Sequence, residues 1–152
     1  MELQEYTIDI PQDLTANILA FKESIPEGDH CSNRGGWQLS YQDAPPEWIQ
    51  TTYQAVKDLL PEYTVSRAWM NVNGPGHSNR WHRHHVDEYA AVLYVQVPEN
   101  SGKMEFRIDH VNYPIQPVAG KCYVFSSNYM HCVHENKSTD NRISLAFNLV
   151  KR

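Results

Sequence analysis

The sequence has few cysteines and no long apolar run. Cys31, Cys122 and Cys132 make an odd number without a Cys-x-x-Cys pair, which excludes a disulfide framework and a zinc-knuckle pattern. No apolar stretch approaches the ~20 residues of a membrane span, and residues 1–5 lack the basic start and apolar core of a signal peptide. We therefore expect a cytoplasmic protein without a membrane partner.

An excess of basic residues is also absent. The 152-residue chain carries 13 Lys and Arg against 18 Asp and Glu, a formal net charge of -5. No basic stripe interrupts this balance, so we expect no nucleic-acid partner. Hydrophobic residues make up 41% of the sequence, which suits a folded core in a chain of this length. A single domain over residues 1–152 is expected.

The first 62 residues predict two helices. Apolar residues recur at helical spacing over residues 11–24 and over residues 45–60, where prolines flank the segment. Residues 27–44 between them hold three glycines and few aliphatic residues, and we expect a loop there. Residues 1–62 should therefore form a helical support for the rest of the chain.

From residue 63 the pattern changes to short strands separated by Pro, Gly, Asn and Asp. The expected strands cover residues 65–71, 90–97, 103–108, 121–125, 130–134 and 142–150. No helical crossover lies between them, which excludes a doubly wound parallel sheet. A mainly β core over residues 63–152, built as a sandwich, jelly roll or barrel, remains.

The last expected strand has two different faces. Its apolar residues Ile143, Leu145, Phe147 and Leu149 alternate with Arg142, Ser144, Ala146 and Asn148. Alternate side chains on a strand point to the same face. We expect Arg142 and Ser144 to point together into a polar space, the inside of the barrel.

Histidines are concentrated in one stretch. Four of the eight histidines fall between residues 77 and 85, and a single residue separates His82 from His84. On an extended backbone both imidazoles leave the same face and can reach one metal ion. His131, far away in the sequence, can complete a three-ligand site in a jelly roll. Such a site leaves coordination positions open for a bidentate organic acid and for dioxygen.

From Trp69 to Asn148 these residues form a recognisable series. It consists of Trp69 and Asn71, then His82 and His84, the strand Ala90-Ala91-Val92-Leu93-Tyr94-Val95, His131, and Arg142-Ile143-Ser144. This series resembles the iron(II)- and 2-oxoglutarate-dependent oxygenases, in particular a small family often found in marine bacteria and phages. The resemblance covers about half of the chain.

The resemblance implies a fold and a set of cofactors. The fold would be a double-stranded β-helix, which is a jelly-roll or cupin-like barrel, with the two N-terminal helices packed on it. Iron(II) would be held by His82, His84 and His131. The far carboxylate of 2-oxoglutarate would be bound by Arg142, Ser144 and Tyr94. The implied activity is oxidation, by hydroxylation, of an unidentified substrate with release of succinate and CO2.

One departure from the superfamily concerns the second metal ligand. Most of these oxygenases present His-x-Asp, whereas His82 and His84 form His-x-His. The sequence His85-Val86-Asp87, three residues later, does spell His-x-Asp and is an alternative pair. Absence of the carboxylate accompanies halogenation in some relatives, so the type of oxidation stays open.

A cupin is the alternative from the same residues. Gly76, His82, His84 and Glu88 fit the first cupin motif, with Glu88 as a fourth metal ligand. Such a protein would be an isomerase, a dioxygenase that does not use 2-oxoglutarate, or a ligand-binding module. Arg142 discriminates between the two, because a cupin does not need an inward arginine there.

Partners and substrate are less specified by the sequence. We expect a small-molecule or peptide substrate, selected by loops over the barrel mouth at residues 27–44 and 72–81, and a homodimer stays open. A third, non-enzymatic interpretation is a jelly roll without metal that binds a partner through an aromatic surface. That surface would consist of Trp37, Trp48, Trp69 and Trp81.

Overall fold

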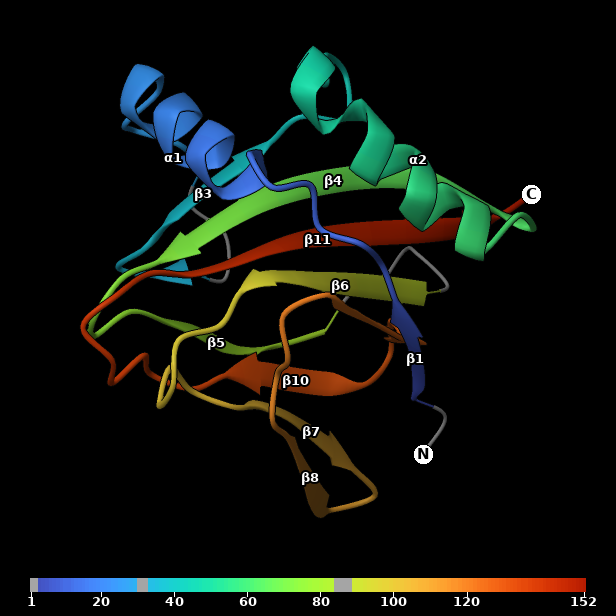
Figure 1. Cartoon of the computed structure of the whole chain (residues 1–152). Helices are drawn as coiled ribbons and strands as arrows, with labels where there is room; N and C mark the ends of the chain where they lie inside the picture. Colours follow the sequence, from blue (N-terminus) through green and yellow to red (C-terminus); the bar gives the residue numbers. More distant parts are fainter. Residues whose placement is uncertain (1–2, 30–32, 84–88) are drawn as a thin grey trace.

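Two antiparallel β-sheets lie face to face in the computed structural model of the protein, which describes residues 3–29, 33–83 and 89–152 (Figure 1). The larger sheet has the strand order β1-β9-β6-β11-β4-β3, and the smaller sheet has the order β2-β5-β10-β7-β8. The strands are β1 (Gln4–Thr7), β2 (Asn33–Arg34), β3 (Trp37–Ser40), β4 (Tyr63–Asn73), β5 (Ser78–His82), β6 (Tyr89–Gln96), β7 (Met104–Ile108), β8 (Val111–Ile115), β9 (Lys121–Ser126), β10 (Met130–Val133) and β11 (Arg142–Lys151).

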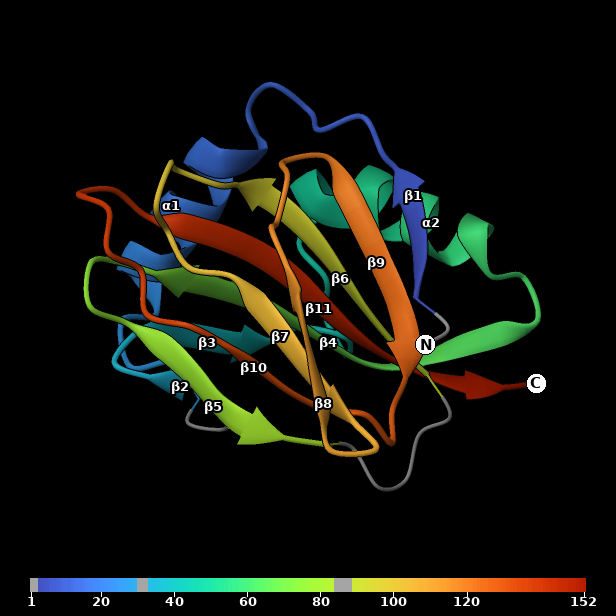
Figure 2. The same ribbon diagram turned by 90° about the horizontal axis from the view of Figure 1, so that it is seen from below.

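The strands from β4 to β11 follow a jelly-roll path. β4, β6, β9 and β11 belong to the larger sheet, while β5, β7, β8 and β10 belong to the smaller one. The chain therefore crosses between the sheets repeatedly, and β4 and β11, its first and last core strands, become hydrogen-bonded neighbours. Seen from below, the strands of the smaller sheet lie in front (Figure 2). The expected mainly β, double-stranded β-helix fold is confirmed.

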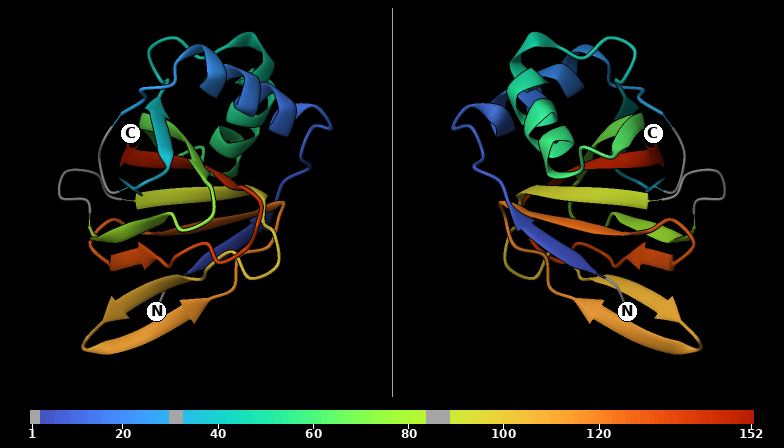
Figure 3. Two further views of the ribbon diagram at one scale, coloured as in Figure 1. Left: turned by 90° about the vertical axis from the view of Figure 1, so that its left-hand side faces the viewer. Right: turned by 90° about the vertical axis from the view of Figure 1, so that its right-hand side faces the viewer.

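Two helices cover the outer face of the larger sheet (Figure 3). They are α1 (Leu14–Ser24) and α2 (Gln50–Leu59), and the short 3-10 helix η1 (Glu47–Ile49) precedes α2. Both helices end just before the prolines that the sequence places after them, since a proline disfavours helical backbone in the residue before it. The two predicted helices are confirmed. None of the helices in the described residues is long and apolar enough to span a membrane.

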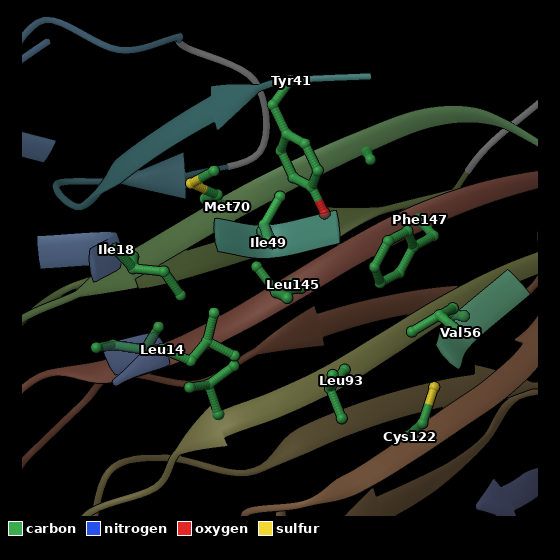
Figure 4. Packing of buried hydrophobic residues seen from close by; sticks show 14 of the residues in the cluster. Leu14, Ile18, Tyr41, Ile49, Val56, Met70, Leu93, Cys122, Leu145 and Phe147 are labelled. Atoms are coloured by element: carbon green, nitrogen blue, oxygen red, sulfur yellow. The ribbon is translucent and has the colours of Figure 1, made fainter. Parts of the chain in front are cut away.

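The main hydrophobic core fills the space between these helices and the larger sheet (Figure 4). Leu14 and Ile18 of α1 and Val56 of α2 pack there with Leu145 and Phe147 of β11, all at most 1% exposed. Full burial of such a side chain stabilises the fold by about 1.5–3 kcal/mol. The apolar face of β11 is thus turned toward the helices, and its other face is turned toward the smaller sheet.

Two segments expected to be loops contain strands. Residues 27–44 include β2 and β3, and residues 72–81 include the end of β4 and most of β5. The loop prediction was wrong there because these strands are short and contain few aliphatic residues. Pairing with neighbours far away in the sequence forms them: β3 pairs with β4, and β5 pairs with β10 and β2. Residues 1–62 therefore contribute strands to both sheets as well as the helices.

Candidate active site

A cavity of about 570 Å³ lies between the two sheets. Arg142, Ser144, Ala146 and Asn148, the inward face of β11, line it from the larger sheet, and His82 and His131 line it from the smaller sheet. Arg142 and Ser144 thus face the interior together, as the alternation along their strand predicts. The cavity is the place where the predicted site residues of the described chain meet.

A row of polar side chains crosses the floor of this cavity. The strand register places Tyr94 of β6 opposite Ser144 of β11, Ser144 opposite Asn71 of β4, and Asn71 opposite Gln38 of β3. Residues directly opposite in antiparallel strands have Cα atoms about 4.5–5.5 Å apart. All four line the cavity, so Tyr94 and Ser144, far apart in the sequence, become adjacent here.

Arg142 is buried at one end of the cavity, with 2% of its surface exposed. Its Nη1 donates hydrogen bonds to the carbonyl oxygens of Ser101 and, at 3.0 Å, of His134. Its Nη2 is buried and has no hydrogen-bond partner within the described residues. Burial lowers the pKa of the guanidinium, and the electrostatic interaction with the neighbouring Tyr94 acts in the opposite direction.

No carboxylate of the described chain forms an ion pair with Arg142. An unpaired buried charge is costly, by several kcal/mol even after relaxation. Nη2 of Arg142 therefore lacks a hydrogen-bond acceptor, and a ligand bound in the cavity could provide one. An anion that enters the cavity would provide both the acceptor and the countercharge.

Tyr94 lies close enough to Arg142 for the two to interact electrostatically. It is 1% exposed, and its burial raises the pKa of its hydroxyl to about 12, although the charge of Arg142 acts in the opposite direction. The hydroxyl therefore stays protonated at neutral pH and can donate a hydrogen bond. Together with Ser144, it adds neutral donors beside the guanidinium.

His82 and His131 face each other across the pairing of β5 and β10. They are Cα partners in the register, and their ring centroids are 4.2 Å apart. The Nδ1 atom of His82 lies 2.7 Å from the carbonyl oxygen of Arg80, and that of His131 lies 2.8 Å from the carbonyl oxygen of Tyr129. A carbonyl can only accept, so these contacts place the proton on Nδ1 and the lone pair of each ring on Nε2.

This tautomer suits metal binding. Burial lowers the pKa of His82, which favours the neutral ring that a metal needs. His131 is 5% exposed, and its ring packs against Phe106 and Phe125 with centroids 5.8 and 4.9 Å away. The two imidazoles are thus oriented by backbone carbonyls and by packing, as ligands in an ordered metal site are.

The third predicted ligand, His84, lies outside the described residues. So do His85, Asp87 and Glu88, which carry the alternative His-x-Asp pair and the cupin ligand. Within residues 3–29, 33–83 and 89–152 no group of three or more candidate metal ligands occurs. The described chain therefore contains a histidine pair, and the identity of a third ligand stays a prediction.

Several cavity residues were not anticipated from the sequence. Arg67, Trp69, Asn71 and Asn73 of β4 all line the cavity, and of these only Trp69 and Asn71 were noted. Their alternation with the buried apolar residues of the same strand is the signal that could have identified the others. Trp37 and Trp69 are 3% and 7% exposed, so neither contributes to an exposed aromatic patch.

Comparison with known proteins supports the fold and not a closer relationship. No protein-family model matches the chain. No curated protein matches it significantly either. Solved structures do match it over almost its whole length.

Three of these structures illustrate the similarity. A prolyl-4-hydroxylase from Pseudomonas putida matches with a TM-score of 0.70 and 21% identity, over 99% of this chain and 92% of its own. A viral collagen prolyl hydroxylase from Paramecium bursaria Chlorella virus-1, solved with 2-oxoglutarate, has a TM-score of 0.67 and 15% identity over 99% and 97%. The α-ketoglutarate-dependent epimerase SnoN from nogalamycin biosynthesis has a TM-score of 0.73 and 12% identity over 98% and 77%.

The chain therefore has the fold of the iron(II)- and 2-oxoglutarate-dependent oxygenases, and the predicted resemblance is confirmed at the level of the fold. These structures are named as hydroxylases and as an epimerase. One fold thus supports different reactions, and the reaction must be inferred from the site.

Proposed function

We propose that this protein is an iron(II)- and 2-oxoglutarate-dependent oxygenase. It would oxidise a small-molecule or peptide substrate, by hydroxylation, with release of succinate and CO2. The observation that carries this proposal is the buried Arg142, whose Nη2 has no hydrogen-bond partner in the described chain, in a cavity that also contains the oriented pair His82 and His131.

The residues around Arg142 fit the far carboxylate of 2-oxoglutarate. Arg142 would donate from Nη2, and the hydroxyls of Ser144 and Tyr94 would donate beside it. Hydrogen bonds between charged partners are about twice as strong as neutral ones. A neutral ligand would satisfy the hydrogen bond but would leave the buried positive charge without compensation.

The histidines fit the metal. His82 and His131 would bind iron(II) through Nε2, with His84 as the proposed third ligand. When bound together, iron and 2-oxoglutarate supply the activation of dioxygen. The chain's own contribution is to hold the rings in one tautomer, to orient the oxo acid through Arg142, and to exclude water with apolar walls that include Phe125 and Met104.

A cupin remains the alternative, with Glu88 as an additional ligand. The two functions share the fold and the histidines, and they differ in the need for Arg142. A cupin would have no reason to bury a guanidinium group with an unsatisfied nitrogen at the end of its cavity, so the environment of Arg142 favours the oxygenase. The predicted cytoplasmic location and the homodimer are separate predictions, testable by cell fractionation and by analytical ultracentrifugation.

Calorimetric titration of 2-oxoglutarate under anaerobic conditions tests the proposed function. The titration is run on iron(II)-loaded protein, on metal-free protein and on the loaded Arg142→Ala variant. Arg107→Ala is the matched control, because Arg107 is exposed and hydrogen-bonds to Asn112 of β8, away from the cavity. We expect micromolar to low-millimolar binding that requires both the metal and Arg142.

Two other results would point elsewhere. Iron binding without 2-oxoglutarate binding would contradict the oxygenase and favour the cupin, and Glu88→Ala would then be the next variant. Absence of both metal and 2-oxoglutarate binding would favour a jelly roll without a metal.

A further inference from the structure

The end of the cavity remote from Arg142 is also basic. Arg67 of β4 lines the cavity and pairs in register with Asn148, six positions along β11 from Arg142. At about 3.3 Å per residue, the two positions are roughly 20 Å apart along the strand. Arg67 is exposed whereas Arg142 is buried, so Arg67 lies on the open side of the cavity.

An irregularity in β4 brings two neighbouring polar residues to this opening. Arg67 pairs with Asn148 and Val65 pairs with Leu149, which leaves Ser66 as an extra residue in the strand. Ser66 donates its hydroxyl to the carbonyl oxygen of Asn148 at 3.3 Å. Because of this bulge, consecutive residues Ser66 and Arg67 both line the cavity, which regular alternation would forbid.

Trp69 supports the guanidinium of Arg67. The Cζ atom of Arg67 lies 6.0 Å from the ring centroid of Trp69, within the range of a cation–π contact. Trp69 is 7% exposed and itself lines the cavity. The contact limits the positions of the arginine without neutralising its charge.

The described cavity wall carries positive charge and no negative charge. Arg67, Arg80 and Arg142 line it, and no Asp or Glu of the described residues does. In that part of the chain, neither Arg67 nor Arg80 forms an ion pair. This composition contrasts with the net charge of -5 of the whole chain. A cleft lined by one sign of charge concentrates ligands of the opposite sign.

We propose that the substrate is a small organic anion whose carboxylate or phosphate group binds Arg67 at the cavity mouth. This inference rests on the proposed function, because there the inner guanidinium of Arg142 is occupied by the oxo acid. The planar guanidinium of Arg67 can donate two parallel hydrogen bonds to either anion. A cationic substrate would meet Arg67 and Arg80 and no acidic partner among the described residues. Trp69 would pack against the apolar part of the bound molecule.

Binding measurements on the metal-loaded protein test this inference. The protein is saturated with iron(II) and 2-oxoglutarate under anaerobic conditions and titrated calorimetrically with free amino acids, dicarboxylic acids and sugar phosphates. Each carboxylic acid is paired with its primary amide, and each sugar phosphate with its free sugar. The same titrations are made on Arg67→Gln, and 2-oxoglutarate itself is titrated into both proteins.

Arg107→Gln is the matched control for Arg67→Gln. Arg107 is also exposed and also stacks on a tryptophan, with its Cζ atom 4.6 Å from the ring centroid of Trp81, but neither residue lines the cavity. Both variants remove one exposed positive charge that lies over a tryptophan ring. Only the change at Arg67 removes it from the cavity.

We expect at least one anion to bind, its neutral counterpart to bind at least about tenfold more weakly, and Arg67→Gln to weaken anion binding by about 10- to 100-fold. Arg107→Gln should leave that affinity within about twofold. Preference for carboxylic acids or for sugar phosphates would identify the anionic group.

Binding of 2-oxoglutarate without binding of any anion of the panel would overturn this inference alone. So would anion binding that Arg67→Gln does not weaken. Failure of 2-oxoglutarate to bind the wild-type protein would overturn the proposed function and this inference with it.

Discussion

Replacement of Arg142 by methionine should separate the stability of the protein from its response to 2-oxoglutarate. Methionine fills much of the space of the arginine stem but carries no charge. The variant loses two hydrogen bonds to backbone carbonyls, each worth about 1.5–3 kcal/mol. The variant is also stabilised, because it no longer buries an unpaired cation, which costs several kcal/mol. Since these effects oppose each other, we expect the ligand-free Tm to change by less than about 5 °C.

The rise in Tm caused by 2-oxoglutarate should differ much more between the wild-type protein and Arg142→Met. A ligand at about a hundred times its Kd adds about 2.7 kcal/mol to the free energy of unfolding. In a chain of this size, that corresponds to a rise in Tm of about 5–10 °C. Loss of the Nη2 donor and of the positive charge that compensates the carboxylate should weaken binding by about 100-fold. The Arg142→Met variant should then show almost no rise at the same concentration.

Thermal unfolding of the metal-loaded proteins, followed by circular dichroism without oxygen, measures both quantities. The control ligand is 2-oxopentanoate, which keeps the oxo acid end and lacks the far carboxylate. It should shift the Tm of the wild-type protein and of Arg142→Met equally. A full 2-oxoglutarate shift in Arg142→Met would refute the assignment of Arg142 to the far carboxylate.

Three further predictions concern the metal, a glycine and a thiol. His131→Ala should reduce iron(II) affinity at least about 100-fold in equilibrium dialysis while keeping the circular dichroism spectrum, because the loss of even an outer partner costs 10–100-fold; unchanged affinity would remove His131 from the ligand set. Gly102→Ala should weaken 2-oxoglutarate binding, because the added Cβ would clash with the carbonyl oxygen of His134, an acceptor of Arg142, and would lie 2.7 Å from Arg142 Nη1. Gly76 also has a positive φ, but no atom lies within 4 Å of its added Cβ, so Gly76→Ala should leave binding unchanged. Equal titration results for the two variants would contradict this prediction. Burial raises the pKa of the Cys122 thiol to about 12, so iodoacetamide at about pH 8.5 should alkylate Cys122 only after unfolding in urea, as peptide mass spectrometry would show. The free energy of unfolding should fall as the pH rises above the ordinary pKa of a thiol, because only the unfolded chain then loses the proton. Rapid alkylation of the native protein would contradict this prediction.

Local patterns were sufficient for the elements with strong periodicity. Helix α1, helix α2 and strand β11 were anticipated because their apolar residues repeat at a regular spacing and prolines mark the helix ends. The two faces of β11 were also readable, and with them the inward direction of Arg142 and Ser144. Strand β5 could not be predicted, since it is short and polar and depends on pairing with β10 and β2.

The sequence by itself determined which residue types are available: a histidine cluster, a distant histidine, and an arginine and serine on one strand face. Only the tertiary structure decided that His82 and His131 are register partners, and that Tyr94 and Ser144 lie side by side. It also showed that Nη2 of Arg142 lacks a partner in the described chain and that Arg67 lines the same cavity. The physical reason is that side-chain direction follows from local backbone geometry, whereas burial, partners and charge compensation depend on strands that meet only when the jelly roll closes.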